Sequence, residues 1–82
     1  MSYYITRINF ANLNEEDKKK LKETLEYCRT HDKHGTFQYR ITGETVRIIS
    51  PDMETAKKRG YYFKKKFGVF FNILIEVQQV EE

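Results

Sequence analysis

Residues 57–66 combine positive charge with aromatic rings, a combination that suits contact with a polyanion. Cationic side chains meet phosphates while exposed tyrosine rings stack on bases, as in proteins that bind single-stranded nucleic acid. A solvated helix, or a surface that docks on another protein, is the alternative explanation of the same residues. The predicted contact for RNA or another nucleic acid consists of Lys57, Lys58, Arg59, Tyr61, Tyr62, Lys64, Lys65 and Lys66.

The positive charge of the chain is concentrated around this segment. Residues 51–68 carry six cations against Asp52 and Glu54, a net charge of +4, whereas the whole chain has a net charge of +3. A concentrated patch attracts phosphates through counterion release, while the same charge spread evenly mainly aids solubility. The charge pattern therefore favours a polyanionic partner without identifying it.

A second candidate anion site consists of Arg40 and Arg47, which the expected hairpin register places opposite each other. Like charges in cross-strand positions are destabilising, so the pair is easier to understand if an anion, or a carboxylate such as Glu76, lies between them. Guanidinium groups also stack harmlessly and splay apart, which is the alternative. We expect the two arginines to extend the nucleic-acid surface.

Other reactive side chains give little support for metal binding or catalysis. Cys28, His31 and His34 are three residues apart, but structural zinc sites use four ligands in paired spacing and no second pair is present. The chain contains no glycine-rich phosphate loop, no HExxH motif and no nucleophile elbow. We therefore expect no metal, no cofactor and no catalytic residues, and predict that the protein is not an enzyme.

Two helices are predicted, and the second carries the basic aromatic residues 57–66. Asn14 and the acidic residues after it predict a helix from about residue 15 to residue 30. Ser50 as N-cap and Pro51 as the first helical residue predict a second helix, which ends at Gly68. Gly60 falls on its inward face, where it is expected to allow close approach of helix and strand backbones. The inward face of the second helix is predicted to be Met53, Ala56, Gly60, Phe63 and Phe67.

Four strands complete the pattern, at residues 3–10, 37–41, 45–49 and 69–80. The middle two form the clearest unit, because Gly43 and Glu44 fit a two-residue type II′ hairpin turn. The predicted hairpin pairs are Ile41/Val46, Tyr39/Ile48, Thr42/Thr45, Arg40/Arg47 and Gln38/Ile49.

The order strand, helix, hairpin, helix, strand predicts an α+β fold of the ferredoxin-like βαββαβ type. Such a fold has a four-stranded antiparallel sheet with both helices on one face. The other face is left open, and by alternation it carries Ile49, Phe70 and Leu74. Because an exposed apolar patch beside a small core more often marks an interface, we predict a homodimer that buries these three residues.

Length and composition place the chain in a broad class. Eighty-two residues form a single domain, residues 1–82, because halves would be too small to bury a core. A lone Cys28 and the lack of a signal-peptide pattern predict a cytoplasmic location. The longest apolar-rich stretch, residues 69–77, is too short for a membrane span, so we expect no membrane partner.

Two resemblances bear on function. The predicted topology resembles the RNA-recognition-motif family, but the outward residues of the third strand, Thr45, Arg47 and Ile49, include no aromatic ring. In size and in its richness in lysine and aromatic residues, the chain resembles the short early proteins of T-even-like bacteriophages. These include inhibitors of host defence, such as the RNA-binding inhibitor of a toxin–antitoxin ribonuclease. This resemblance implies a counter-defence role in the host cytoplasm and assigns no site residues.

The sequence thus predicts a small non-enzymatic module that binds RNA or another nucleic acid through a basic aromatic helix. The alternative is an inhibitor that uses the same surface to dock on a host enzyme or defence complex.

Overall fold

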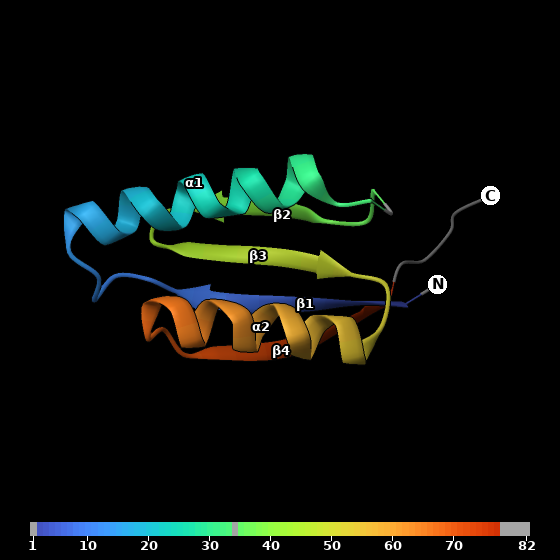
Figure 1. The fold of residues 1–82 in the computed structure, drawn as a ribbon. Coiled ribbons are helices and arrows are strands. Elements are labelled where there is room, and N and C mark those ends of the chain that lie inside the picture. The colour runs from blue at the N-terminus through green and yellow to red at the C-terminus, as the bar shows by residue number, and fades with distance from the viewer. Residues whose placement is uncertain (1, 34, 78–82) are drawn as a thin grey trace.

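The computed structural model describes residues 2–33 and 35–77, and its six elements follow the predicted order (Figure 1). The strands form one antiparallel sheet in the order β2-β3-β1-β4, with both helices on the same face. This α+β ferredoxin-like arrangement confirms the predicted fold class. The elements are β1 (Ser2–Asn9), α1 (Glu15–His31), β2 (Gln38–Thr42), β3 (Thr45–Ser50), α2 (Met53–Phe67) and β4 (Phe71–Val77).

The β2–β3 hairpin has the predicted register, including Arg40 opposite Arg47. Gly43 has a φ of 60°, the left-handed value that a type II′ turn requires at its first central residue. All five predicted pairs are confirmed. The alternation of these strands therefore determines which side chains face the helices and which face away.

The two helices begin at polar caps, but the second begins later than predicted. Asn14 accepts a hydrogen bond from the Asp17 amide at 2.8 Å and caps α1. Asp52, not Ser50, caps α2 by accepting from the Thr55 amide at 2.7 Å. Ser50 is instead the buried last residue of β3. Ser50 lies two residues before the N-cap, and its Oγ accepts a hydrogen bond from Arg59, so the prediction of Ser50 as cap was wrong.

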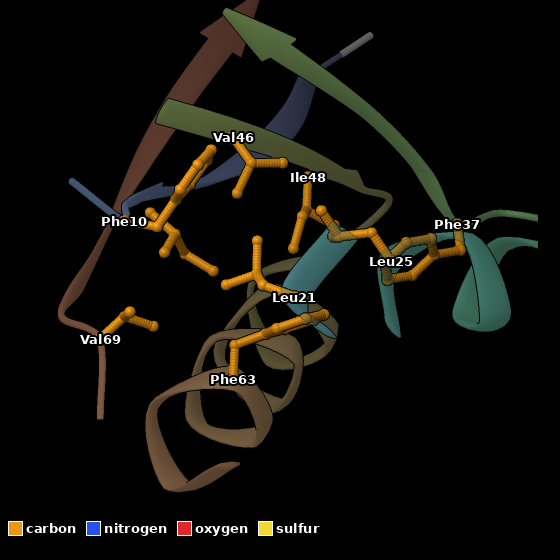
Figure 2. Close-up of a cluster of buried hydrophobic side chains, with 9 residues drawn as sticks. Phe10, Leu21, Leu25, Phe37, Val46, Ile48, Phe63 and Val69 are labelled. Carbon is orange, nitrogen blue, oxygen red and sulfur yellow. The ribbon is translucent and has the colours of Figure 1, made fainter. Parts of the chain in front are cut away.

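The core lies between the helices and the inner face of the sheet (Figure 2). Leu21 and Leu25 from α1 and Phe63 from α2 are fully buried against Val46 and Ile48 of β3. This confirms the inward face predicted for α2, on which Ala56 and Gly60 are also buried. Both helices are therefore held by one face, which leaves their other sides exposed.

Gly60 is buried on the inner face of α2, but the group that approaches it is a side chain. A Cβ at this position would lie 2.4 Å from Cδ2 and Cε2 of the Phe71 ring. The prediction of a close backbone approach is therefore corrected to a close approach of the Phe71 ring from β4.

The last strand is shorter than predicted within the described part of the chain. It starts at Phe71 rather than Val69, and Val69 is buried in the core before the strand begins. Residues 78–80 of the predicted strand lie outside the described residues. Neither helix in the described ranges is long and apolar enough to cross a membrane.

Candidate nucleic-acid interface

The outer side of α2 presents most of the predicted cationic surface. Ala56, Gly60 and Phe63 are buried against the sheet, so the remaining positions of the helix face outward. Two tyrosines lie on this outer side: Tyr61 is 59% exposed and Tyr62 is 44% exposed. The exposed cations of the segment are Lys57, Lys58, Lys64, Lys65 and Lys66.

Arg59 does not belong to this exposed surface. Its side chain is only 14% exposed. Its Nη1 donates to the Ile49 carbonyl at 3.0 Å and to Ser50 Oγ at 2.9 Å, and its Nη2 donates to Thr36 Oγ1 at 3.0 Å. Burial lowers the pKa of the guanidinium, and nearby carboxylates oppose this shift. Because its hydrogen bonds are made inside the protein, the expected role of Arg59 as an exposed phosphate contact does not fit this geometry.

A groove runs between α1 and α2, with a volume of about 810 Å³. We call it the interhelical groove. Tyr62 and Lys66 of α2 line one wall, and Tyr27 of α1 lines the other. A second hollow of about 390 Å³ shares both tyrosines and includes Lys58. The two hollows together form a trough with aromatic rings on both walls and lysines along α2.

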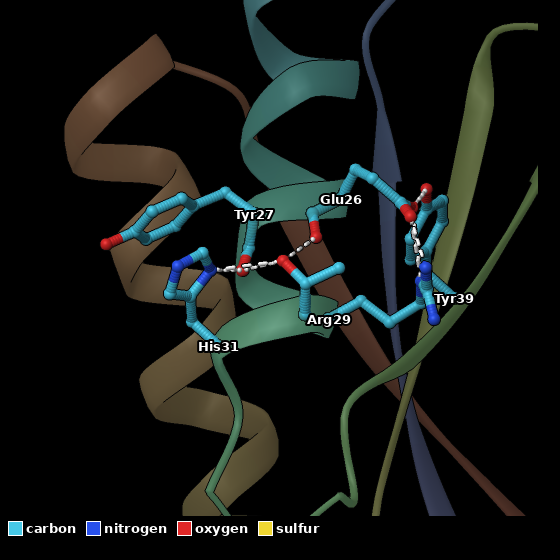
Figure 3. A network of polar contacts seen from close by, with 6 residues as sticks. Glu26, Tyr27, Arg29, His31 and Tyr39 are labelled. Atoms are coloured by element: carbon cyan, nitrogen blue, oxygen red, sulfur yellow. Dashed lines mark hydrogen bonds and ion pairs between the residues drawn. The ribbon is translucent and has the colours of Figure 1, made fainter.

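Tyr27 and His31 were not predicted as part of the site. Their rings stack at 4.0 Å between centroids, and the His31 Nδ1 lies 2.9 Å from the Tyr27 carbonyl (Figure 3). Tyr27 is 60% exposed. It lies next to the buried stripe of α1 in the sequence, but only the spacing of the two helices shows that it faces Tyr62.

On the other side of that turn of α1, Glu26 anchors the helix to the edge strand β2. The Tyr39 hydroxyl donates to Glu26 Oε2 at 2.6 Å, and Arg29 forms an ion pair with the same carboxylate (Figure 3). Arg29, and then Tyr39, lower the pKa of Glu26 to about 2. This network fixes the helical turn that carries Tyr27.

The side of α2 away from the groove has its own shallow hollow, of about 400 Å³. Tyr61 packs edge-on against Phe71 with ring centroids 5.1 Å apart. Phe70, which is 80% exposed, lies outside β4, and Lys64 Nζ is 5.7 Å from its ring centroid. Phe70 is therefore beside α2 and does not share the open sheet face with Ile49 and Leu74, as the alternation had suggested.

Arg40 and Arg47 lie on the opposite face of the sheet from α2. Their strand neighbours Ile41, Val46 and Ile48 point into the core, so both arginines point away from it. The sheet thus separates the arginine pair from the lysines of α2. The expectation that they extend one continuous surface does not fit this geometry.

The described residues give no support for a metal site at Cys28 and His31. Burial raises the pKa of the Cys28 thiol, which keeps it protonated and disfavours both metal ligation and nucleophilic attack. Among the described residues, no three His, Cys, Asp or Glu side chains are grouped as metal ligands would be. His34, the third of the evenly spaced residues Cys28, His31 and His34, lies outside the described residues.

Comparison with known proteins adds no family to these observations. No protein-family model, no curated protein and no solved structure matches the chain. Function is therefore inferred from the geometry and chemistry of the site.

Proposed function

We propose that this protein is a non-enzymatic module that binds single-stranded nucleic acid, and RNA in the first instance, at α2 and the interhelical groove. The observation that supports this most directly is the pairing of Tyr62 with Tyr27 across a groove whose α2 rim carries Lys58 and Lys66. A strand in this position places its bases between the helices and its phosphates along α2.

The groove is large enough to hold an organic ligand and is lined by rings that can stack on bases. Its volume of about 810 Å³ lies within the range of roughly 300–1,000 Å³ found for ligand pockets. Base–aromatic stacking tolerates any sequence, because every base has a π-face. Two tyrosine rings from different helices therefore supply affinity without strong sequence preference.

The charges around the groove orient the backbone of the bound strand. Asp17, Glu23 and Lys20 lie on the α1 wall, which is net negative, while Lys58 and Lys66 lie on the α2 side. Phosphates are repelled by the carboxylates and attracted by the ammonium groups. The strand consequently runs with its phosphates over α2, where Lys65 is also exposed.

Charge reversal tests this proposal directly. Binding of RNA oligomers of unrelated sequence is measured by fluorescence anisotropy across a salt series. Lys58→Glu combined with Lys65→Glu is expected to weaken binding to every sequence. It also lowers the slope of log affinity against log salt by about 0.7 for each phosphate that the variant no longer neutralises.

A matched control separates a local contact from net charge. Lys19→Glu combined with Lys22→Glu makes the same change in charge at exposed positions of α1 that do not line the groove. The control is expected to retain most of the affinity. Equal losses in the two double variants would show that binding is not located on α2.

A second experiment distinguishes RNA binding from the alternative function, inhibition of a host enzyme or defence complex. The tagged chain is used to capture partners from a bacterial lysate with and without ribonuclease. Loss of the captured material after ribonuclease supports RNA binding. A single protein retained at equal yield after ribonuclease would support the inhibitor and count against the proposal.

A further inference from the structure

The open face of the sheet carries an arginine on each of three adjacent strands. Arg40 of β2 is opposite Arg47 of β3, and Arg47 is in turn opposite Arg7 of β1. All three side chains are exposed. Since adjacent strands lie about 4.8 Å apart, the row spans about 10 Å. We call these three residues the arginine row.

Nothing in the described part of the chain neutralises this row. Among the residues whose side chains the structure describes, 3–33 and 35–75, no ion pair or side-chain hydrogen bond involves any of the three arginines. Glu44, in the adjacent hairpin turn, is bound by Lys18 of α1 at 2.6 Å. Glu76, the carboxylate considered from the sequence, is paired in the backbone register with Tyr3 and not with an arginine. Like charges side by side on a sheet oppose folding, so the row is more stable with an anion bound.

The surface beside the row is hollowed and polar. Arg7, Arg47, Thr42 and Thr45 line a hollow of about 260 Å³. Guanidinium groups bind phosphate oxygens through two parallel hydrogen bonds, and threonine hydroxyls add further donors. Neighbouring guanidinium groups spread over about 10 Å can hold two phosphate groups side by side.

The next row of residues along the sheet is apolar. It consists of Ile49, Ile5 and Leu74, which are cross-strand partners one strand period from the arginine row. Ile5 is only 6% exposed although it points away from the helices, while Leu74 is 38% exposed. An organic group attached to the bound phosphates would lie on this apolar floor, about 7 Å from the arginines.

We propose that the arginine row is a second anion site, specific for a ligand with two linked phosphate groups that carries a flat organic group. It lies on the face opposite α2 and goes beyond the proposed function. Two sources share this chemistry, a free nucleoside diphosphate and two successive phosphates of a nucleic-acid strand. Each makes its phosphate contacts at Arg7, Arg47 and Arg40.

The test uses inorganic pyrophosphate, ADP and a short RNA oligomer as probes, followed by chemical shifts of the backbone amides. Pyrophosphate is expected to shift the amides around Arg7, Thr45 and Arg47. Arg47→Gln is expected to weaken pyrophosphate binding at least about tenfold, because it removes the central guanidinium. Arg29→Gln is the matched control, because Arg29 lies on α1 in an ion pair with Glu26.

Further comparisons identify the source of the phosphates and separate this site from α2. The comparison is made at the amides around Arg7 and Arg47 in the Lys58→Glu, Lys65→Glu variant, in which RNA binding at α2 is weakened. There, tighter binding of ADP than of the oligomer indicates a free nucleotide, and the reverse order indicates a nucleic-acid backbone. Lys58→Glu with Lys65→Glu is expected to leave pyrophosphate binding unchanged, even if that variant no longer binds RNA. Arg7→Gln serves as a second variant should Arg47→Gln fail to fold. Pyrophosphate binding that survives Arg47→Gln and Arg7→Gln, or that is lost in the lysine variant, would overturn the proposal.

Discussion

Arg59 belongs to the basic segment, but its partly buried side chain stabilises the fold through hydrogen bonds within the protein. Its guanidinium joins α2 to the end of β3 at Ile49 and Ser50, and to the loop before β2 at Thr36. It also lies 4.8 Å from the ring centroid of Phe37. A planar group with five donors can serve all of these neighbours together, whereas an ammonium group cannot.

Arg59→Lys is therefore expected to lower the free energy of unfolding by about 1–3 kcal/mol, because buried acceptors lose their donors. Urea denaturation measures this loss. The folded variant should bind RNA as tightly as the native chain. A variant of native stability with weakened RNA binding would instead place Arg59 in contact with the ligand.

Tyr62 is the residue on which stacking depends. Its ring lines the interhelical groove, and its main contact with the core is an edge-on packing against Phe63 with ring centroids 5.2 Å apart. Tyr62→Ala is expected to weaken single-strand binding by about 1–3 kcal/mol. Tyr62→Phe keeps the ring and should bind almost normally in the same anisotropy assay. Loss of thermal stability without loss of binding in Tyr62→Ala would show that the ring only packs.

At the scale of elements, the contact of α2 with β4 depends on the missing side chain of Gly60. Alanine there gains about 1 kcal/mol in helix propensity. Its Cβ would overlap the Phe71 ring, however, and overpacking costs about 1–3 kcal/mol. We expect Gly60→Ala to be destabilising in thermal unfolding. Adding Phe71→Leu should relieve part of the loss, so that the double variant is more stable than the sum of the single changes implies. Additive effects would disprove the overlap.

The docking of α1 on β2 is expected to depend on pH through Glu26. Its pKa is about 2 in the folded chain, below the ordinary value of 4.5, chiefly because of Arg29 and then Tyr39. A lowered carboxyl pKa stabilises the fold above the unfolded value and loses this effect as pH falls from about 4.5 towards 2.

Glu26→Gln should therefore differ most from the native chain above about pH 5, and the difference should shrink towards pH 2. Denaturant unfolding at several pH values measures it. Glu23→Gln is the control, because none of the ion pairs between described residues includes Glu23. A constant difference across this pH range would contradict the proposed origin of the shift.

The elements themselves were largely predictable from local patterns, whereas the site was not. Alternation in residues 37–49 predicted the hairpin register, and the spacing of apolar residues predicted the buried face of α2. The roles of Arg59 and Asp52 depend on where β3 ends, which a local pattern does not show. Tyr27 and Tyr62 lie on opposite walls of one groove only because the two helices pack at a particular distance on different strands. That distance is a tertiary property, which local sequence patterns do not show.

For the molecule as a whole, the homodimer stays a prediction, and its expected interface is smaller than the sequence implied. Leu74 and Ile49 remain on the open sheet face, but Phe70 does not, and the arginine row borders the apolar residues. Two copies joined through this face would bring their arginines close together. Association by this route should therefore be opposed by charge.

We expect the mass in analytical ultracentrifugation to rise towards a dimer as salt increases from about 0.05 M to about 0.5 M, because salt screens the arginines. Leu74→Glu should abolish this rise. A dimer that is unaffected by Leu74→Glu would place the interface elsewhere. A monomer at every salt concentration would refute the dimer.

The central position of β1 also has a consequence for the order of events during folding. β1 is flanked by β3 and β4, both of which come later in the chain, so that Ile5 pairs with Ile49 and with Leu74. Both pairings close long loops, and such non-local contacts form slowly. While the chain is being synthesised, the hairpin can form before β1 has both neighbours. One edge of β1 therefore has no hydrogen-bond partner until the last strand has been made, and an unpaired edge makes such an intermediate prone to aggregate.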